Sequence, residues 1–283
     1  MRRPQDIASE EATMGTMLTL TTAFEGIASM HISRIKNQVL QAQGFFEELW
    51  KMYDQLRVDK LFRFGRQQTD EVIDKELFIA VTAEGGFSGD IDQKLITWML
   101  KDYNPKLQDI IIIGHHGAVQ LTQAGIQFKK YYKLPSKDQN INVAPLVRQV
   151  RYYRSTTMYF QSYVSLMVQD IKRMEIRKAV QQAGDRVGQD EEVISNATYI
   201  FEPSNFAVVA HLERSMVEIT LSQAILESKL AQYASRFRAM SVSKTRATDM
   251  HDDLHLLYNQ TKRAMADERL KEVINGLKKV QAQ

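Results

Sequence analysis

The sequence predicts an α/β fold in which the N- and C-terminal helices form a long antiparallel coiled coil, with an α/β domain inserted between them in the chain. Apolar residues recur every 3.5 positions in residues 1–60 and again in 203–283, which is the spacing of a coiled-coil seam. Residues 75–202 hold most of the short β-type runs, so we expect the inserted domain there. The chain thus divides into 1–60, 75–202 and 203–283.

The first helix is predicted from an apolar pattern that begins at Met17. Alternating steps of four and three residues reach twelve positions, of which nine are apolar; the exceptions are Thr21, His31 and Gln38. A 3.5-residue repeat of this length indicates a coiled coil rather than one face of a short globular helix. The positions are Met17, Thr21, Phe24, Ala28, His31, Ile35, Gln38, Ala42, Phe45, Leu49, Met52 and Leu56.

The last helix is predicted because no proline follows Pro203, which favours a single helix of roughly 70 residues. Its phase slips by one position between Met240 and Met250 and again near Asp267, so the supercoil must overwind or unwind there. The expected seam is Leu212, Met216, Ile219, Gln223, Leu226, Leu230, Tyr233, Phe237, Met240, Ala247, Met250, Leu254, Leu257, Thr261 and Ala264.

The middle of the chain alternates strand-like and helix-like segments. The strand-like runs are KELFIAVTA, DIIIIGHHG and NATYIF. The helix-like piece IDQKLITWMLKDY lies between the first and second of these runs, and GAVQLTQAG follows the second. This rhythm predicts a small, partly parallel, Rossmann-like sheet covered by helices. Residues 158–175 fit either strand or helix, and QQAGDRVGQDEE, 181–192, is expected to be a surface loop. The terminal helices bury their seams most simply against each other.

Composition limits the function. The 283 residues contain no cysteine, which excludes a disulfide framework and cysteine-ligated zinc or iron–sulfur sites and fits a reducing, cytosolic compartment. No apolar stretch approaches the roughly 18 residues of a membrane span, and MRRPQDIASEEA lacks the apolar region of a signal peptide, so direct membrane insertion is not expected. A net charge of +3 is too small to indicate a nucleic-acid partner.

Two blocks near the C-terminus resemble the gamma subunit of F-type ATP synthases. Residues 199–240, YIFEPSNFAVVAHLERSMVEITLSQAILESKLAQYASRFRAM, are similar to the start of that family's C-terminal helix, with tyrosine, Glu-Pro-Ser, a Gln-Ala-x-x-Glu-Ser stretch and Ala-Ser-Arg. Residues 254–277, LHLLYNQTKRAMADERLKEVINGL, resemble its final turns. The spacing between the blocks also fits without a gap.

The rest of the chain is similar to the family in the same order. LTTAFEGIASMHISRIK shares Thr21, Ala23 and Ala28 with the N-terminal motif, VTAEGGFSGDIDQKLI stands where the family has a strand, a glycine-rich loop and a helix, and IIIGHHG matches a Val-Gly-Lys-Lys-Gly turn. Thr22 and Glu25 replace two family lysines, and Lys262 and Arg263 replace an Arg-Gln pair. These departures indicate a divergent branch.

The resemblance implies a rotor shaft: a non-catalytic subunit, without cofactor, metal or nucleotide of its own, in a rotary ATPase or ATP synthase. Its implied partners are a ring of ATPase alpha and beta subunits, an epsilon-type stalk subunit and a membrane ring of ion-carrying subunits, so the chain would be cytoplasmic and peripheral to a membrane. The implied ring contacts are Phe24, Glu25, Lys262, Arg263 and Arg269. The implied contacts at the foot of the shaft are Gly85, Gly86, Phe87, Ser88, Gly89 and Asp90.

The glycine-rich loop VTAEGGFSGD could suggest a phosphate cradle, but Gly85, Gly86 and Gly89 match neither G-x-G-x-x-G nor the P-loop pattern. Glu84 and Asp90 would also repel an anion. We therefore expect a tight turn whose glycines adopt positive φ at low cost.

Three histidine patterns are also ambiguous. HDDLH has the spacing of the zinc motif H-E-x-x-H, but its general base is replaced by Asp252 and no third ligand is evident, which favours surface histidines. His115 and His116 follow a strand, but the sequence places no Ser, Cys or acid beside them, so a loop is expected. His31 lies in the seam and is interpreted as a satisfied polar core residue.

The C-terminal 22 residues are basic. Six basic residues stand against Asp267, Glu268 and Glu272, giving +3. These cations suit the negative end of the helix dipole, and the resemblance implies that they also face acidic loops of the ring. The basic residues are Lys262, Arg263, Arg269, Lys271, Lys278 and Lys279.

Other functions stay open at this point. The chain could be a coiled-coil scaffold with an inserted α/β module that holds unrelated proteins apart, or a gamma-like shaft of a repurposed rotary motor. A small-molecule enzyme built on the α/β module is disfavoured, since the sequence offers no nucleophile, base and metal-ligand set.

Overall fold

A computed structural model describes residues 2–56, 73–136, 141–187, 202 and 204–281. Backbone contacts divide the chain into two units, which we call the helix-pair unit (Met1–Ile27 with Phe237–Gln283) and the sheet unit (Ala28–Arg236). The elements are α1 (Pro4–Leu56), β1 (Ile73–Val81), α2 (Ile91–Asp102), β2 (Gln108–Ile113), α3 (His115–Gln123), β3 (Lys130–Tyr132), α4 (Ala144–Arg151), β4 (Tyr153–Tyr163), β5 (Gln169–Glu175), α5 (Ile176–Val187) and α6 (Asn205–Gln281).

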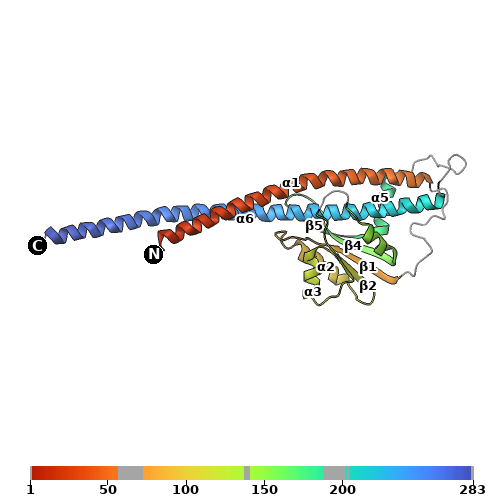
Figure 1. Ribbon diagram of the computed structural model, residues 1–283, viewed down its shortest axis with the longest axis horizontal. Coiled ribbons are helices and arrows are strands. Elements are labelled where there is room, and N and C mark those ends of the chain that lie inside the picture. Colours follow the sequence, from red (N-terminus) through yellow and green to blue (C-terminus); the bar gives the residue numbers. More distant parts are fainter. Residues whose placement is uncertain (1, 57–72, 137–140, 188–201, 203, 282–283) are drawn as a thin grey trace. The chain divides into compact units, whose positions relative to one another are not determined.

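The sheet unit contains a five-stranded sheet in the order β3-β2-β1-β4-β5 (Figure 1). β1 lies in the middle and runs parallel to both β2 and β4, β3 is parallel to β2, and β5 is antiparallel to β4. Residues 77–81 of β1 are all buried, because a central parallel strand is covered on both faces. The mixed α/β fold with a partly parallel sheet is thus confirmed.

Helices cover both faces of this sheet. On one face, Leu95 and Met99 of α2 and Leu121 of α3 pack against Phe78 of β1. On the other face, α4 is joined by α6, which contributes Leu221, Ala224 and Ile225 to the core. The middle of the long C-terminal helix is therefore part of the core of the sheet unit.

The two long helices run antiparallel within each unit. In the sheet unit, the ring of His31 stacks on that of Tyr233, with centroids 4.4 Å apart, and residues further along α1 meet residues earlier in α6. In the helix-pair unit, Glu25 contacts Lys244 and Glu11 contacts His255, in the same antiparallel sense. The expectation that His31 is a satisfied residue of the helix interface agrees with its stacking.

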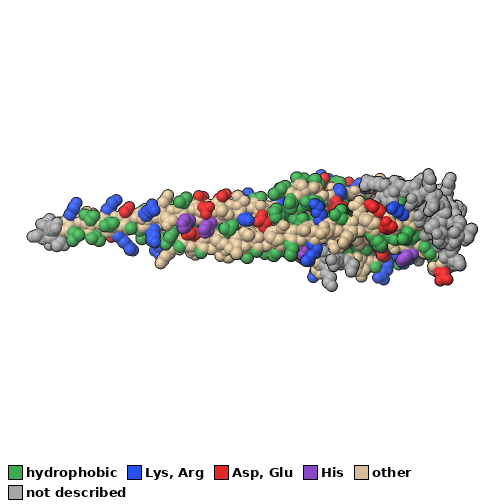
Figure 2. Space-filling view, turned by 90° about the horizontal axis from the view of Figure 1, so that it is seen from above, with side chains coloured by type: hydrophobic (Ala, Val, Ile, Leu, Met, Phe, Trp, Pro, Cys, Tyr) green, Lys and Arg blue, Asp and Glu red, His purple; other side chains and the backbone are tan. Residues whose placement is uncertain are grey.

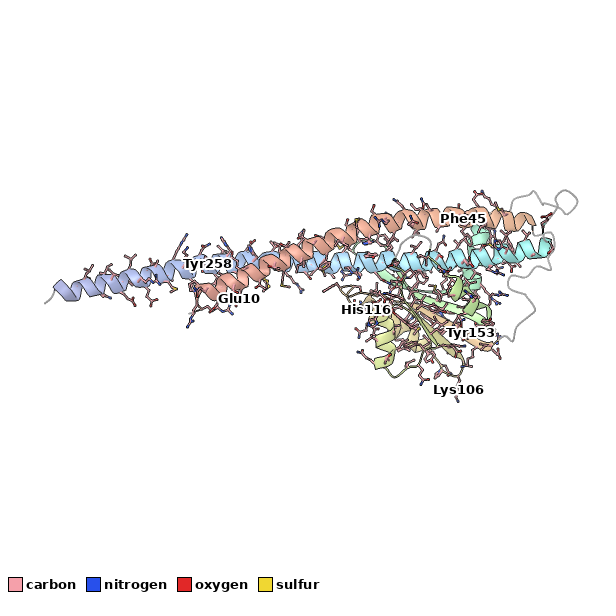
Figure 3. The ribbon with its side chains drawn as sticks, in the orientation of Figure 1. Glu10, Phe45, Lys106, His116, Tyr153 and Tyr258 are labelled. Atoms are coloured by element: carbon pink, nitrogen blue, oxygen red, sulfur yellow. The ribbon has the colours of Figure 1, made fainter. Side chains whose placement is uncertain are left out.

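The seam of α1 departs from the predicted heptad. Ala28 and Ile35 are buried as expected, but Phe45 and Met52 are 59% and 51% exposed, whereas the next residues, Phe46 and Tyr53, are buried (Figure 3). The predicted positions Ala42 and Leu49, which alternate with them, are half-buried. The prediction was therefore one residue early at Phe45 and Met52, and correct at the alternate positions of this end.

The buried and half-buried apolar residues of α1 in the sheet unit keep a 3.5-residue repeat. From Ala28 they succeed one another in alternating steps of four and three residues, and Trp50 is buried in addition. The repeat therefore has the predicted spacing. Its positions are Ala28, Ile32, Ile35, Val39, Ala42, Phe46, Leu49 and Tyr53.

The predicted seam of α6 is correct over most of its length. Residues 212, 216, 226, 230, 240 and 247 are buried. Met250 and Leu257, in contrast, are 51% and 39% exposed, so the prediction is wrong for them. Polar contacts also join α1 to this part of α6 in the helix-pair unit, where Glu25 pairs with Lys244 and Glu11 with His255.

Other local predictions also needed correction. Residues 181–187 continue α5 instead of forming a loop, because Ile176 and Val180 of the same helix are fully buried and anchor it.

Residues 158–175 are the β4–β5 hairpin, which resolves their ambiguity in favour of strand. β3 and α4 were not anticipated. Residues 188–192 of the expected loop and the NATYIF run lie outside the described residues.

Within the part of the chain that the structure describes, no helix has the length and apolar character needed to cross a membrane.

Candidate partner-contact sites

The C-terminal end of α6 presents its whole surface. Residues 266–278 are all exposed, and their large apolar side chains are 46–60% exposed. A groove beside the start of α1 is lined by Pro4, Tyr258, Met265 and Arg269, and α6 continues past this point (Figure 1). The apolar residues are Leu270, Val273, Ile274 and Leu277. Such a continuous mixed surface on a single helix is suited to binding another protein.

Basic side chains alternate with apolar ones on this end of α6 (Figure 2). Lys262 holds its ammonium group 5.9 Å from the centre of the Tyr258 ring, a cation–π contact that orients it along the helix. Arg263 and Arg269 are exposed, and Arg269 also lines the groove beside Pro4. The three predicted basic contacts therefore lie on the accessible end of α6.

The two predicted contacts on α1 lie elsewhere in the helix-pair unit. Phe24 is 39% exposed. The carboxylate of Glu25 lies 3.0 Å from the Lys244 ammonium group and is only 18% exposed, so it stabilises the pairing of α1 with α6. Lys262 is 18 residues further along α6 than Lys244, or about 27 Å at 1.5 Å per residue. The five predicted ring contacts thus form two separate groups.

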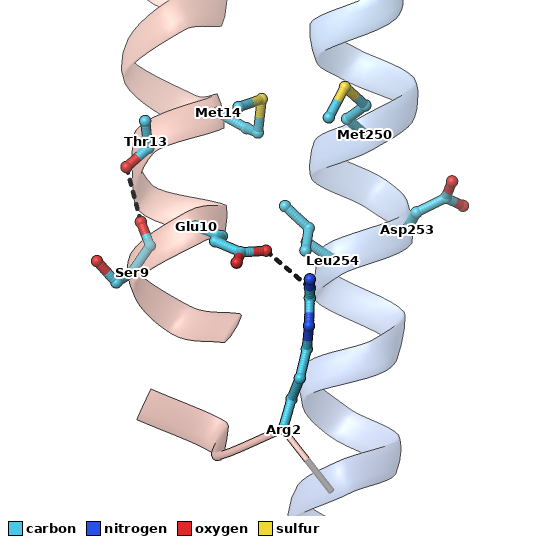
Figure 4. Close-up of a pocket in the computed structure, with 8 residues that line it drawn as sticks. All are labelled: Arg2, Ser9, Glu10, Thr13, Met14, Met250, Asp253 and Leu254. Atoms are coloured by element: carbon cyan, nitrogen blue, oxygen red, sulfur yellow. Dashed lines mark hydrogen bonds and ion pairs between the residues drawn. The ribbon is translucent and has the colours of Figure 1, made fainter. Parts of the chain in front are cut away.

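A second groove lies between the start of α1 and α6 (Figure 4). Arg2 reaches across it to within 3.1 Å of the Glu10 carboxylate, and the sulfur-containing side chains of Met14 and Met250 face each other above this ion pair (Figure 4). Arg2 and Glu10 are both largely exposed, so their pairing contributes little to stability.

The HDDLH histidines make separate contacts. His255 lies 2.8 Å from Glu11 of α1, and His251 lies 3.5 Å from its neighbour Asp252. The described residues contain no group of three or more potential ligands that could hold a metal ion. His255 instead joins the two helices of the unit.

The glycine-rich loop is attached to α6. Its positive backbone angles fall at Phe87 and Gly89, both with φ of 68°, so the expectation of positive φ is right for Gly89 and wrong for Gly85 and Gly86. The Arg236 guanidinium donates to the carbonyl oxygens of Gly86 and Gly85, at 3.2 and 3.4 Å. A phosphate site needs converging N–H donors, whereas these groups are acceptors turned to a cation.

The remaining residues of the loop are held by α6 and by residues 131–134. The Ser235 hydroxyl of α6 donates to the Ser88 carbonyl oxygen at 2.7 Å, and Ser88 itself is buried. Glu84 accepts hydrogen bonds from the Tyr131 hydroxyl and the Leu134 amide. Phe87, at the turn, is 64% exposed. Of the six predicted foot contacts, Phe87 therefore offers the largest accessible apolar surface.

His115 and His116 begin α3, so the expected loop is wrong there; His116 is labelled in Figure 3. An acid does lie beside His116. The Nδ1 atom of His116 lies 2.9 Å from the carboxylate of Asp92, which is 2% exposed. Asp92 also accepts hydrogen bonds from the Ala83 amide and from Nε2 of Gln161. Burial raises the pKa of Asp92, although the hydrogen bonds from His116 and Ala83 oppose that shift.

Gln161 links Asp92 to α6. Its Oε1 atom accepts hydrogen bonds from the Ser228 hydroxyl and from Nε2 of Gln232, and all three residues are buried. Sequence reasoning missed this group, because Asp92 and Gln161 stand far apart in the chain. The available signal was the pair Ser228 and Gln232, two uncharged polar residues four positions apart and therefore on one face of α6.

This architecture, with two long helices and an inserted sheet, is similar to that of chains in solved ATP synthase structures. One similar chain, from the Tetrahymena thermophila mitochondrial ATP synthase central stalk and c-ring, has a TM-score of 0.58 at 15% identity and matches 79% of this chain and 98% of its own. Another, from Euglena gracilis mitochondrial ATP synthase, has a TM-score of 0.56 at 14% identity and matches 95% and 96%. These similarities establish the fold.

Sequence comparison gives the family. The model of the ATP synthase family matches residues 5–280. The ATP synthase gamma chain of Geobacter metallireducens is 23% identical over 273 residues, covering 92% of this chain and 93% of the relative. That of Mycoplasmoides gallisepticum is 20% identical over 296 residues, covering 99% and 100%. The chain therefore belongs to the gamma chain family of ATP synthases, whose members are non-catalytic subunits.

Proposed function

We propose that the chain is the central rotor shaft of an F-type rotary ATPase or ATP synthase, which couples rotation to conformational changes in catalytic partners without binding nucleotide itself. The observation that carries the proposal is the family match over residues 5–280, which includes both long helices and the inserted sheet. The accessible basic and apolar end of α6 supports it, because a shaft needs a surface on which its partners act.

In this function the paired stretches of α1 and α6 act as an antiparallel coiled coil, and the chain is organised as helix 1–60, Rossmann-like domain 75–202 and helix 203–283. The partners are ATPase alpha and beta subunits, an epsilon-type stalk subunit and a membrane ring of ion-carrying subunits. The chain itself is cytoplasmic and peripheral to the membrane. The solved structures with a similar fold come from assemblies described as central stalk, F1 and c-ring.

The mechanism follows from unequal contacts. Two helices of different composition present a different surface in each direction, so a surrounding ring of like subunits meets a different surface at each position. A shaft can shift the conformational equilibrium of a ring subunit only by the difference between its contact free energies with the two conformations. Rotation then drives nucleotide release, or hydrolysis drives rotation, with the chemistry on the partners.

Two sets of contacts are assigned to this function. Phe24, Glu25, Lys262, Arg263 and Arg269 contact the catalytic ring. The loop Gly85, Gly86, Phe87, Ser88, Gly89 and Asp90 belongs to the foot, where Phe87 is the main contact because its side chain is exposed.

Assembly from purified components tests the proposal. The full chain, mixed with ATPase alpha and beta subunits from the same cell, should form a complex of fixed stoichiometry whose ATPase activity requires the chain. The matched control is the chain truncated after residue 265, which removes the exposed end of α6 but keeps the sheet unit. A chain that binds neither subunit, or binds without changing the ATPase rate, would favour a scaffold.

A further inference from the structure

A buried polar chain crosses the sheet unit and ends on α6. It begins at His116 of α3, passes through Asp92 of α2 and Gln161 of β4, and reaches Ser228 and Gln232 of α6. The hydrogen bond from Nε2 of Gln161 to Asp92 is 2.6 Å long, and Nε2 of Gln232 also donates to the Ser228 hydroxyl oxygen at 3.0 Å. Four of these five residues are at most 5% exposed.

In its ionised form, the Asp92 carboxylate fixes the orientation of the Gln161 amide. A carboxylate only accepts, so the amide of Gln161 must turn its NH2 group toward Asp92 and its oxygen toward α6. That oxygen then requires donors, which the Ser228 hydroxyl and the Gln232 amide supply. One charge on α2 thereby determines which groups of α6 can face β4.

Stability alone does not account for this carboxylate. Burial raises the pKa of Asp92, which means that the fold favours its neutral form over the ionised form. Buried ion pairs and triads can often be replaced as a whole by apolar groups without loss of stability, and the best-attested role of buried polar groups is to select one register among several. The surrounding contacts of Leu221 and Ile225 are apolar and non-directional, so they do not select a register by themselves.

We propose that Asp92 is a positioning residue that, through Gln161, sets the rotational and axial register in which the sheet holds α6. In a rotor this register fixes the angle between the inserted domain and the helix that carries torque. The assignment goes beyond the proposed function and concerns contacts within the sheet unit alone.

The neighbouring charged groups in the sheet unit have other partners. Glu227 of α6 accepts from the Ser162 hydroxyl and pairs with Lys172, and Lys229 donates to the Pro135 carbonyl oxygen at 2.7 Å. On the remaining elements, His115 is exposed, and Lys94 is exposed and pairs with Asp90. Glu84 accepts a hydrogen bond from Tyr131, and Arg236 donates to the glycine-rich loop. Asp92 and His116 are therefore the titratable groups that act on Gln161.

A distance measurement on the full chain tests the proposal. The chain has no cysteine, so Lys101→Cys on α2 and Arg214→Cys on α6, both exposed, give two clean attachment points for spin labels. With Asp92 present, the distance distribution should have one narrow maximum. Asp92→Asn should broaden it about twofold or add a second maximum, because an asparagine can donate or accept and no longer orients Gln161.

A compensating pair distinguishes positioning from space filling. In the double variant Asp92→Asn/Gln161→Glu, the new carboxylate on β4 accepts from the new amide on α2 and from Ser228 and Gln232, so the narrow maximum should return. Asp170→Asn, the same charge change on exposed β5, is the control and should leave the distribution unchanged. Distributions that remain narrow in Asp92→Asn, or that stay broad in the double variant, would overturn the proposal.

A pH series gives a second readout. Acidification of the labelled protein should reproduce the broadening seen in Asp92→Asn, as Asp92 takes up a proton, and should leave the Asp92→Asn distribution unchanged. Equal pH responses of the two proteins would contradict the role of this carboxylate. Because the chain is measured without partners, a failure here leaves the rotor function untouched, and a failure to assemble with ATPase subunits leaves this inference untouched.

Discussion

Two segments of the same helix, residues 221–234 and 266–278 of α6, have opposite surroundings. In the first, residues 228–232 are five consecutive buried positions, so the helix is enclosed on all sides by α1 and by the sheet. In the second, every residue is exposed. The first segment is held by its own chain, whereas the second offers its apolar and basic side chains to other molecules.

Composition accounts for this difference. The enclosed segment carries Ala224, Ala231 and Ala234, all at most 3% exposed, and small side chains allow the backbone of α6 to approach its neighbours closely. The exposed segment carries leucine, isoleucine and valine among lysines and glutamates, and its one alanine is Ala266 at its start. A long helix can therefore combine a fixed part and a partner-binding part without a break in its backbone.

The largest expected effect is on the free energy of unfolding, which should respond to substitution in the enclosed segment but not in the exposed one. Leu221→Ala, in the enclosed part, should lower the free energy of unfolding by about 2–5 kcal/mol, because it leaves a cavity against the sheet. Leu277→Ala, at a side chain that is 60% exposed, should change it by less than about 0.5 kcal/mol. Urea denaturation of both variants measures this; equal losses would mean that the exposed segment is also packed within the chain.

The next effect concerns the exposed segment in the assembled complex. Lys262→Glu/Arg263→Glu should lower the ATPase activity of a reconstituted complex about three- to tenfold, because it replaces two cations on the surface assigned to the ring. The matched control, Lys101→Glu/Lys106→Glu, makes the same charge change at exposed positions of the sheet unit, of which Lys106 is labelled in Figure 3. Unchanged activity after the charge reversal on α6, or an equal loss in the control, would remove the assigned role.

A smaller effect tests the polar contacts of the enclosed segment. Ser228→Ala removes a donor to Gln161 and should lower the free energy of unfolding by about 1 kcal/mol. Ser243→Ala, at an exposed position of the same helix, should stay within about 0.5 kcal/mol of the unmodified protein. A loss that is no greater at residue 228 than at residue 243 would show that the polar chain does not hold α6.

The smallest expected effect is a pH dependence. The pKa of Asp92 is raised in the folded protein, so its favourable contribution is fully present below the unfolded pKa and is lost as pH rises through the folded pKa. Asp92→Asn removes this titration, so it should gain stability relative to the unmodified protein as pH rises from about 4 toward neutrality. Melting curves at several pH values measure the difference, and one that is constant with pH, or that shrinks, would contradict the raised pKa.

Local patterns in the sequence were sufficient for most elements of the fold. The apolar runs of β1 and β2 and the periodic segments of α2 and α3 lie where expected, because each pattern depends on residues close together in the chain. The long helices were recognisable for the same reason, together with the absence of proline after Pro203.

The errors arose where distant parts of the chain decide the structure. The side of α1 that faces α6 depends on the partner helix, because Phe45 and Phe46 are neighbouring apolar residues, as are Met52 and Tyr53, and the sequence alone does not decide between them. The second buried face of α6 and the partners of Asp92 depend on how the sheet packs, so neither Leu221 nor Gln161 could be assigned a contact from its neighbours in sequence. The contacts proposed for Lys262 and Phe87 are made with other proteins, so the sequence of this chain does not determine them.

The spacing of buried side chains on α1 has a mechanical consequence. Over residues 28–53 they recur every 3.5 positions, and side chains spaced in this way impose a left-handed supercoil on long helices that pack together. Strands that are already wound in one sense tighten when twisted that way and slacken when twisted the other way. We therefore expect the resistance of this stretch to twist to differ between clockwise and anticlockwise rotation.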